Sequence, residues 1–303
     1  MPFANTRNGS AASEGSPPPR EGGRRTGALR FRILSAVLFL PPFVWITRAG
    51  SIPFALFTGA VALLGTWEMV RLLGARGDRP SLPFALAFSA GAIALLYLGR
   101  LDRVFLYACV FFMLVLLSLP ARKGGSAFER AAGASFVFLY AALLPGFLVL
   151  LRELPRAEGI PEEYARGAGF VFLLFLSVWG CDTGAYTVGR LFGRRPLAPS
   201  ISPKKTIEGA VGGVLFAVAG AFAARAWFVD ELRAGDALMI GLGAGVLAQA
   251  GDLVESKLKR EAAVKDSGPF IPGHGGVLDR FDSIFLAAPF VYLYLRIALF
   301  GGV

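Results

Sequence analysis

The residues best suited to chemistry are acidic and basic side chains that crowd into the last third of the chain. Asp252, Glu255 and Lys259 fall on one face of a predicted helix, and Asp279 and Asp282 lie one helical turn apart. Clustered carboxylates beside Lys and Arg side chains suit a divalent cation plus a polyphosphate, because Mg²⁺ binds carboxylate oxygens together with substrate phosphates. A solvated charged loop fits poorly, because these charges alternate with Gly and Pro between apolar runs.

The single histidine belongs to the same region. His274 sits between Gly273 and Gly275, so acid/base work, a phosphate contact and a turn-capping role are all open. One histidine cannot form a zinc site alone, and Cys109 and Cys181 lie within apolar runs where they suit small core residues.

A second candidate segment carries an aspartate inside an otherwise apolar run. Asp182, Tyr186 and Arg190 recur every four residues and therefore share one helix face. Gly180 and Gly184 have the spacing that permits close helix contact. Two interpretations remain open, namely the wall of an active site and a packing helix with a structural Asp–Arg interaction.

A third candidate segment is basic. Ser202 is predicted to cap a helix whose first turn holds Pro203, Lys204 and Lys205. Cations in a first turn oppose the helix dipole, and a bound phosphate would relieve that conflict. The alternative is a basic anchor at the membrane surface without a ligand.

The elements that must position these residues are predicted to be membrane helices. The 303 residues are 55% hydrophobic and 17% charged, with a mean hydropathy of +0.59, which argues against both an ordinary soluble enzyme and a disordered chain. We predict an all-α, polytopic integral membrane helical bundle of about nine transmembrane helices. The predicted spans are 31–48, 51–72, 82–99, 103–120, 131–151, 168–188, 208–228, 236–254 and 283–301.

Composition divides the chain into three parts. Residues 1–28 are rich in Pro, Gly, Ser and Arg, which predicts a disordered basic cytoplasmic tail rather than a cleaved signal peptide. Residues 29–165 are predicted to be an N-terminal transmembrane scaffold, and residues 166–303 a C-terminal transmembrane catalytic region.

The distribution of positive charge predicts the orientation. The tail and the loops near 71–79, 121–130, 190–207 and 255–281, with their flanks, hold 22 of the 31 Lys and Arg residues. Basic loops stay on the cytoplasmic side, so we expect the candidate site to face the cytoplasm of a bacterial-type inner membrane. The net charge of +10 then indicates membrane lipids and phosphate ligands rather than nucleic acid.

The part of the chain that carries the clustered carboxylates resembles the CDP-diacylglycerol synthases, also called phosphatidate cytidylyltransferases. The resemblance covers about residues 168–300, and its pattern of fixed positions spans 27 residues. The matching residues are Ser256, Lys259-Arg260, Lys265-Asp266, Pro272-Gly273-His274-Gly275-Gly276 and Asp279-Arg280-Phe281-Asp282.

The resemblance implies that CTP and phosphatidate are converted to CDP-diacylglycerol and pyrophosphate with Mg²⁺, with a second cation also plausible. It also suggests a homodimer. The residues expected to carry the reaction are Asp252, Asp279, Asp282, Lys265 and His274, and the expected metal ligands are Asp252, Asp279 and Asp182. The residues expected to bind substrate phosphates are Ser202, Lys204, Lys205, Thr206, Lys259, Arg260, Arg280, Gly275 and Gly276.

Two other functions stay in competition at this point. A CTP-dependent polyprenol or phytol kinase would also need basic loops on a helical bundle, but the full motif favours the cytidylyltransferase. A transporter would use Asp182 and Arg225 to line a pathway, but the charges gather at one face instead of running through the membrane.

Overall fold

The computed structural model describes residues 39–74, 80–120, 126–160, 164–268 and 275–301. The chain divides into two compact units, Met1–Val44 and Trp45–Val303. The first unit contributes only residues 39–44 to the described part, and they are helical. Everything below concerns the second unit.

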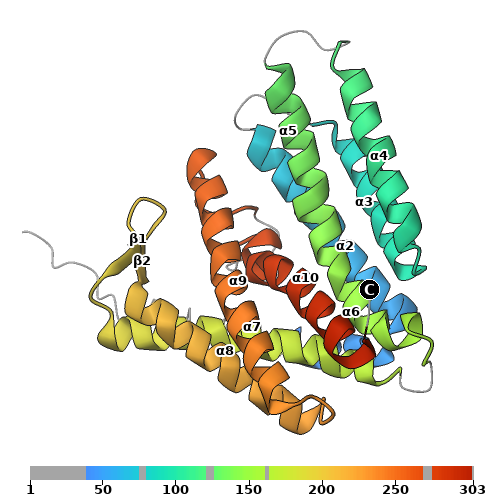
Figure 1. Ribbon diagram of the computed structural model, residues 1–303. Helices are drawn as coiled ribbons and strands as arrows, with labels where there is room; N and C mark the ends of the chain where they lie inside the picture. Colours follow the sequence, from blue (N-terminus) through green and yellow to red (C-terminus); the bar gives the residue numbers. More distant parts are fainter. Residues whose placement is uncertain (1–38, 75–79, 121–125, 161–163, 269–274, 302–303) are drawn as a thin grey trace, which may run out of the picture. The chain divides into compact units, whose positions relative to one another are not determined.

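The second unit is built from long apolar helices (Figure 1). Within the described residues, seven helical spans are long and apolar enough to cross a membrane, and one of them, Ala127–Ala157, runs without a break through α5, η1 and α6. The predicted polytopic helical membrane fold is therefore confirmed. The helices are α2 (Ser51–Gly74), α3 (Leu82–Tyr97), α4 (Leu101–Ser118), α5 (Ala127–Val137), the π-helix η1 (Phe138–Leu143), α6 (Leu144–Ala157), α7 (Arg166–Phe192), α8 (Ile207–Trp227), α9 (Ala234–Glu261) and α10 (Leu278–Phe300).

The observed helices follow the predicted spans, except that α9 and α10 are longer than predicted. The tight hairpin expected between the third and fourth spans is present and joins α3 to α4. The first span is described only from residue 39. However, α9 continues to Glu261 and α10 begins at Leu278, so both helices extend past the apolar residues that predicted them. Helical hydrogen bonds do not require apolar side chains, so Asp252, Glu255, Lys259, Asp279 and Asp282 all lie on regular helix.

Aromatic packing holds the first half of this unit together. Phe111 of α4 stacks on Phe138 of η1 with ring centroids 4.3 Å apart, and Phe88 of α3 packs edge-on against Phe111. The π-helical turn ends just before Pro145, which lacks the N–H that a regular helix needs. The wider turn thereby allows one continuous helix to contain a proline.

Helices α7 and α8 are packed through glycine. A Cβ on Gly180 would lie 2.7 Å from the carbonyl oxygen of Phe216, and one on Gly184 would lie 2.7 Å from that of Gly212. Real side chains do not approach that closely, so these positions require glycine, as their spacing predicted. The close packing continues to the first turn of α8, where a Cβ on Gly209 would lie 2.8 Å from the carbonyl oxygen of Ala185.

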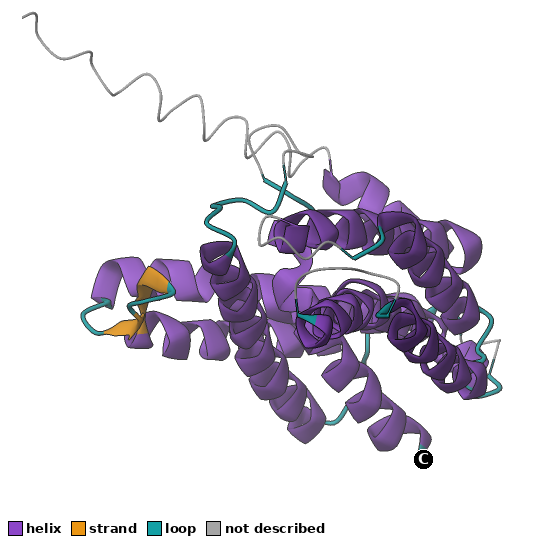
Figure 2. Cartoon of the chain, turned by 90° about the horizontal axis from the view of Figure 1, so that it is seen from above, coloured by secondary structure: helices purple, strands orange, loops and turns teal. Residues whose placement is uncertain are grey.

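The basic segment differs from its prediction. Strands β1 (Pro196–Ala198) and β2 (Ser202–Thr206) form a two-stranded antiparallel ribbon in the connection from α7 to α8 (Figure 2). The predicted helix start at Ser202 is wrong, because Thr206 caps α8 by accepting the N–H of Gly209 at 3.1 Å. Lys204 and Lys205 therefore lie on a strand rather than in a first helical turn. The conflict with a helix dipole does not arise, and the first turn carries Glu208 instead.

Candidate active site

The three segments singled out by their sequence meet at one cavity of about 630 Å³. Helices α7, α9 and α10, strand β2 and the start of α8 all contribute to its lining. Among the described residues, its acidic side chains are Asp182, Asp252, Glu255, Asp279 and Asp282, and its basic side chains are Arg190, Lys204, Lys205 and Lys259. Such a mixed lining suits a polyanion and a cation bound together.

One ion pair joins the β-ribbon to α9. Lys205 Nζ lies 2.5 Å from Asp252 Oδ2, and both side chains are partly exposed to the cavity. Ser256, one turn further along α9, donates its hydroxyl to Asp252 Oδ1 at 3.3 Å. The predicted phosphate-binding lysine and the predicted metal ligand are thus direct neighbours.

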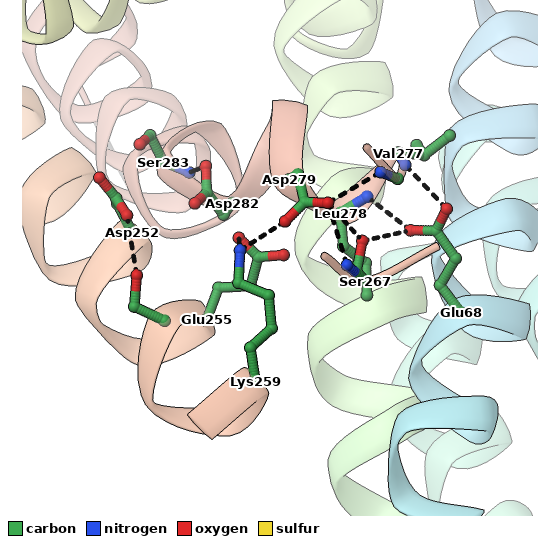
Figure 3. Close-up of polar contacts among 12 residues, drawn as sticks. Glu68, Asp252, Glu255, Lys259, Ser267, Val277, Leu278, Asp279, Asp282 and Ser283 are labelled. Carbon is green, nitrogen blue, oxygen red and sulfur yellow. Dashed lines mark hydrogen bonds and ion pairs between the residues drawn. The ribbon is translucent and has the colours of Figure 1, made fainter. Parts of the chain in front are cut away.

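A second set of charges joins α9 to α10 (Figure 3). Lys259 Nζ lies 3.2 Å from Glu255 Oε2 and also forms an ion pair with Asp279. Glu255 is fully buried and Asp282 is 8% exposed, so this wall of the cavity holds two neighbouring buried carboxyl groups, the first of them paired with the Lys259 ammonium group. The predicted face of Asp252, Glu255 and Lys259 on α9 is confirmed.

The predicted face of α7 is also confirmed, since Asp182, Tyr186 and Arg190 all line the cavity. Arg190 donates to the Tyr186 hydroxyl at 3.0 Å and does not pair with Asp182. With the described residues, the Asp182 side chain makes no hydrogen bond or ion pair. The structural Asp–Arg interaction considered for this helix is therefore not found in the described part of the chain.

Several predicted site residues are placed elsewhere. Ser202, Arg260, Lys265 and Arg280 do not line the cavity, and Arg260 donates to the carbonyl of Ile201 at 3.4 Å. His274 lies outside the described residues, so its predicted role stays a prediction.

The two glycines before α10 have protein partners. Gly275 adopts a φ of +81°, which favours glycine, and the N–H of Gly276 donates to Asp279 Oδ2 at 2.8 Å. Ser267 adds its own N–H to the same oxygen at 3.0 Å. Backbone approach was expected toward a bound phosphate; in the structure it serves Asp279.

Sequence reasoning missed Glu68 of α2. This fully buried carboxylate accepts hydrogen bonds from the N–H of Val277 at 2.8 Å, the N–H of Leu278 at 2.9 Å and the hydroxyl of Ser267 at 3.0 Å (Figure 3). The sequence of residues 29–165 predicts a transmembrane scaffold, with no site residue among them. The available signal was an acidic residue inside a long apolar run, which is costly unless it has a purpose.

The donor set of the cavity fits a hard divalent cation. Its carboxyl oxygens are the ligands that such a cation prefers, and the buried Glu255 carboxyl group lies beside Asp282 and 3.2 Å from Lys259 Nζ. Among the described residues, no three Asp, Glu, His or Cys side chains converge closely enough to enclose a metal on their own. Mg²⁺ does not need such an enclosure, because it is held by one or two carboxylates plus substrate phosphates.

Comparison with known proteins gives one consistent result. The Cytidylyltransferase family profile matches residues 30–298. A phosphatidate cytidylyltransferase of Pseudomonas aeruginosa is 35% identical over 287 residues, covering 90% of this chain and 99% of that protein. Proteins of the same description from Haemophilus influenzae and Bacillus subtilis are 33% and 32% identical, covering 86% and 89% of this chain and 93% and 98% of those proteins. The chain belongs to the cytidylyltransferase family.

Proposed function

We propose that this chain transfers the cytidylyl group of CTP to phosphatidate, giving CDP-diacylglycerol and pyrophosphate. The observation that carries the proposal is the cavity, which gathers carboxylates and lysines from three charged segments between apolar helices. One substrate is a soluble polyanion and the other is a lipid. A charged cavity at the ends of membrane helices provides for both.

The reaction forms one P–O bond and breaks another. A phosphate oxygen of phosphatidate attacks the α-phosphorus of CTP, and the bond from that phosphorus to the bridging oxygen of the β-phosphate breaks to release pyrophosphate. Phosphate monoesters are already anionic near neutral pH, so the chain's task is alignment and charge neutralisation. Lys204, Lys205, Lys259 and Arg190 are the cavity cations available to hold the phosphates.

Asp252, Asp279 and Asp182 would hold Mg²⁺. Bound there, the cation would neutralise the negative charge of the triphosphate and of the departing pyrophosphate. Asp252 and Asp279 are each paired with a lysine in the structure, and these ammonium groups would turn to substrate phosphates.

The orientation is part of the proposal. The cavity lies at the ends of α7 and α9 and the starts of α8 and α10, next to the basic loops 190–207 and 255–281. The positive-inside rule puts these loops in the cytoplasm, where CTP is available. The inner membrane and a homodimer remain predictions of the sequence.

The proposed function is tested with purified protein in detergent, phosphatidate, Mg²⁺ and CTP labelled separately at the α- and γ-phosphates. We expect α label in the lipid product and γ label in pyrophosphate. Label from the γ-phosphate in a lipid would show a kinase. Absence of transfer by folded protein, together with flux of a solute into liposomes, would favour a transporter.

A further inference from the structure

We propose that Glu68 is a positioning residue that fixes the start of α10, and with it the orientation of Asp279 in the cavity. This inference rests on the proposed function only for what Asp279 does. The placement of Glu68 itself is independent of the reaction.

The start of α10 is capped by a side chain from another helix. The first N–H groups of a helix have no partner within the helix, and Val277, at the N-cap position, supplies no capping side chain. The two oxygens of Glu68 accept the N–H groups of Val277 and Leu278 instead, from a helix more than 200 residues earlier in the sequence. Glu68 is also negative, which suits the positive end of the α10 dipole.

The hydroxyl of Ser267 lies between Glu68 and Asp279. Its oxygen lies 3.0 Å from Glu68 Oε2 and 3.0 Å from Asp279 Oδ2, so it bridges the two carboxylates. The N–H of Ser267 also donates to Asp279. Glu68 therefore reaches Asp279 by two routes, one along the α10 backbone and one through Ser267, as Figure 3 shows.

The chain packs tightly around the Glu68 carboxylate. A Cβ on Gly276 would lie 2.6 Å from Glu68 Oε1, and a Cβ on Gly268 would lie 2.8 Å from the same oxygen. Both positions therefore need glycine to accommodate the carboxylate. Gly268 and Gly276 both pack directly against Glu68. The Glu68 side chain itself does not line the cavity.

Glu68→Gln is the main test, because it preserves the size of the side chain while removing its charge. One oxygen becomes an NH₂ group, which would point a donor at an N–H or hydroxyl donor. We expect kcat to fall by about 10- to 100-fold, the usual range for residues that orient a metal ligand, with the KM for CTP changed less than about threefold.

The matched control is Glu153→Gln. Glu153 is also a buried carboxylate, 6% exposed, and it also accepts the N–H at a helix start, that of Ser51 in α2 at 3.1 Å. It lies in α6 and does not line the cavity. If Glu68 only stabilises the fold, both variants should lose folded protein and both should keep the kcat of the protein that remains folded. Equal kcat for the two folded variants would overturn the proposal.

A second pair of variants covers the case in which Glu68→Gln does not fold. Glu68→Asp keeps the charge but shortens the side chain, and Ser267→Ala removes only the bridging hydroxyl. Because one of the two routes from Glu68 to Asp279 passes through Ser267, we expect the double variant to lose less activity than the product of the single losses. If the activity loss of the double variant equals the product of the two single losses, Glu68 and Ser267 act separately, which contradicts the proposal.

Hydrogen exchange separates this inference from the proposed function. Amides of residues 276–279 should exchange at least about tenfold faster in Glu68→Asp than in the wild type, because Glu68 accepts those of Val277 and Leu278 and holds Asp279, which accepts that of Gly276. Residues 51–54 should be unchanged. If wild-type protein transfers no α label from CTP, the proposed function fails, and the exchange result still decides whether Glu68 holds α10. Unchanged exchange at residues 276–279 would overturn the inference even in an active enzyme.

Discussion

The cavity and the N-terminal end of α2 both bury ionisable side chains between helices, yet they use them differently. At the end of α2, Arg152 is fully buried and donates to the backbone carbonyls of Thr47, Arg48 and Tyr164 at 2.7–3.1 Å. Glu153 and the Tyr164 hydroxyl meet the N–H of Ser51. We call Ser51, Arg152, Glu153 and Tyr164 the α2 cluster.

The partners of the charges explain the difference. In the α2 cluster the charged groups satisfy backbone groups at helix ends, which have no other partner, so exchanging them for a ligand would leave buried polar groups unpaired. In the cavity, Lys205 pairs with Asp252 and Lys259 with Asp279 beside open space. Side chains paired with one another can turn to a substrate without unfolding a helix end. Charged groups that pair with other side chains are thus available to a ligand, whereas those that bind backbone groups at helix ends, including Glu68, hold their neighbours in position.

The largest expected effect comes from the cavity. Asp279→Asn keeps the size of the side chain but removes the charge that pairs with Lys259, so we expect kcat/KM for lipid product to fall by at least about 100-fold. Because Asn keeps an oxygen for the N–H groups of Gly276 and Ser267, the variant should still fold in detergent, although loss of the ion pair to Lys259 should lower its melting temperature. Asp102→Asn, in the exposed first turn of α4, is the control and should retain full activity. Turnover like that of the wild type in Asp279→Asn would remove Asp279 from the site.

A smaller effect is expected where α7 packs on α8. Gly180→Ala places a methyl group 2.7 Å from the Phe216 carbonyl oxygen, so we expect a loss of about 1–3 kcal/mol in the free energy of unfolding. Activity should fall as well, because the Asp182 face moves. Gly235→Ala in α9 meets no atom within 4 Å and should be neutral or slightly stabilising. A Gly180→Ala protein as stable as Gly235→Ala would show that close packing of α7 and α8 is dispensable.

The smallest effect is expected in the α2 cluster. Burial, and then the hydrogen bond to Glu153, raise the pKa of Tyr164 from 10.0 to about 12. The hydroxyl's contribution is therefore complete below pH 10 and is lost as the pH rises toward 12. Tyr164→Phe should cost about 1 kcal/mol of unfolding free energy at neutral pH, and the difference from wild type should vanish above the raised pKa. Unfolding measured across this pH range checks both statements, and kcat at neutral pH should stay unchanged.

Local periodicity made much of the site predictable. The spacing of Asp252, Glu255 and Lys259 puts them on one face of any helix, whatever the rest of the fold does. The start of α8 was less predictable, because Ser202 and Thr206 are both good caps and only the pairing of β1 with β2 decides between them. The contact between Glu68 and Val277 was beyond prediction, since periodicity says nothing about which helices become neighbours.

The most direct test compares Asp252→Asn in the cavity with Glu153→Gln in the α2 cluster, measuring kcat/KM and melting temperature on the same preparations. We expect Asp252→Asn to lose at least about 100-fold in cytidylyl transfer with its melting temperature preserved. Glu153→Gln should melt at a lower temperature, with the kcat/KM of its folded fraction unchanged. The reverse pattern, with activity kept in Asp252→Asn and lost in folded Glu153→Gln, would contradict the assignment of the cavity as the active site.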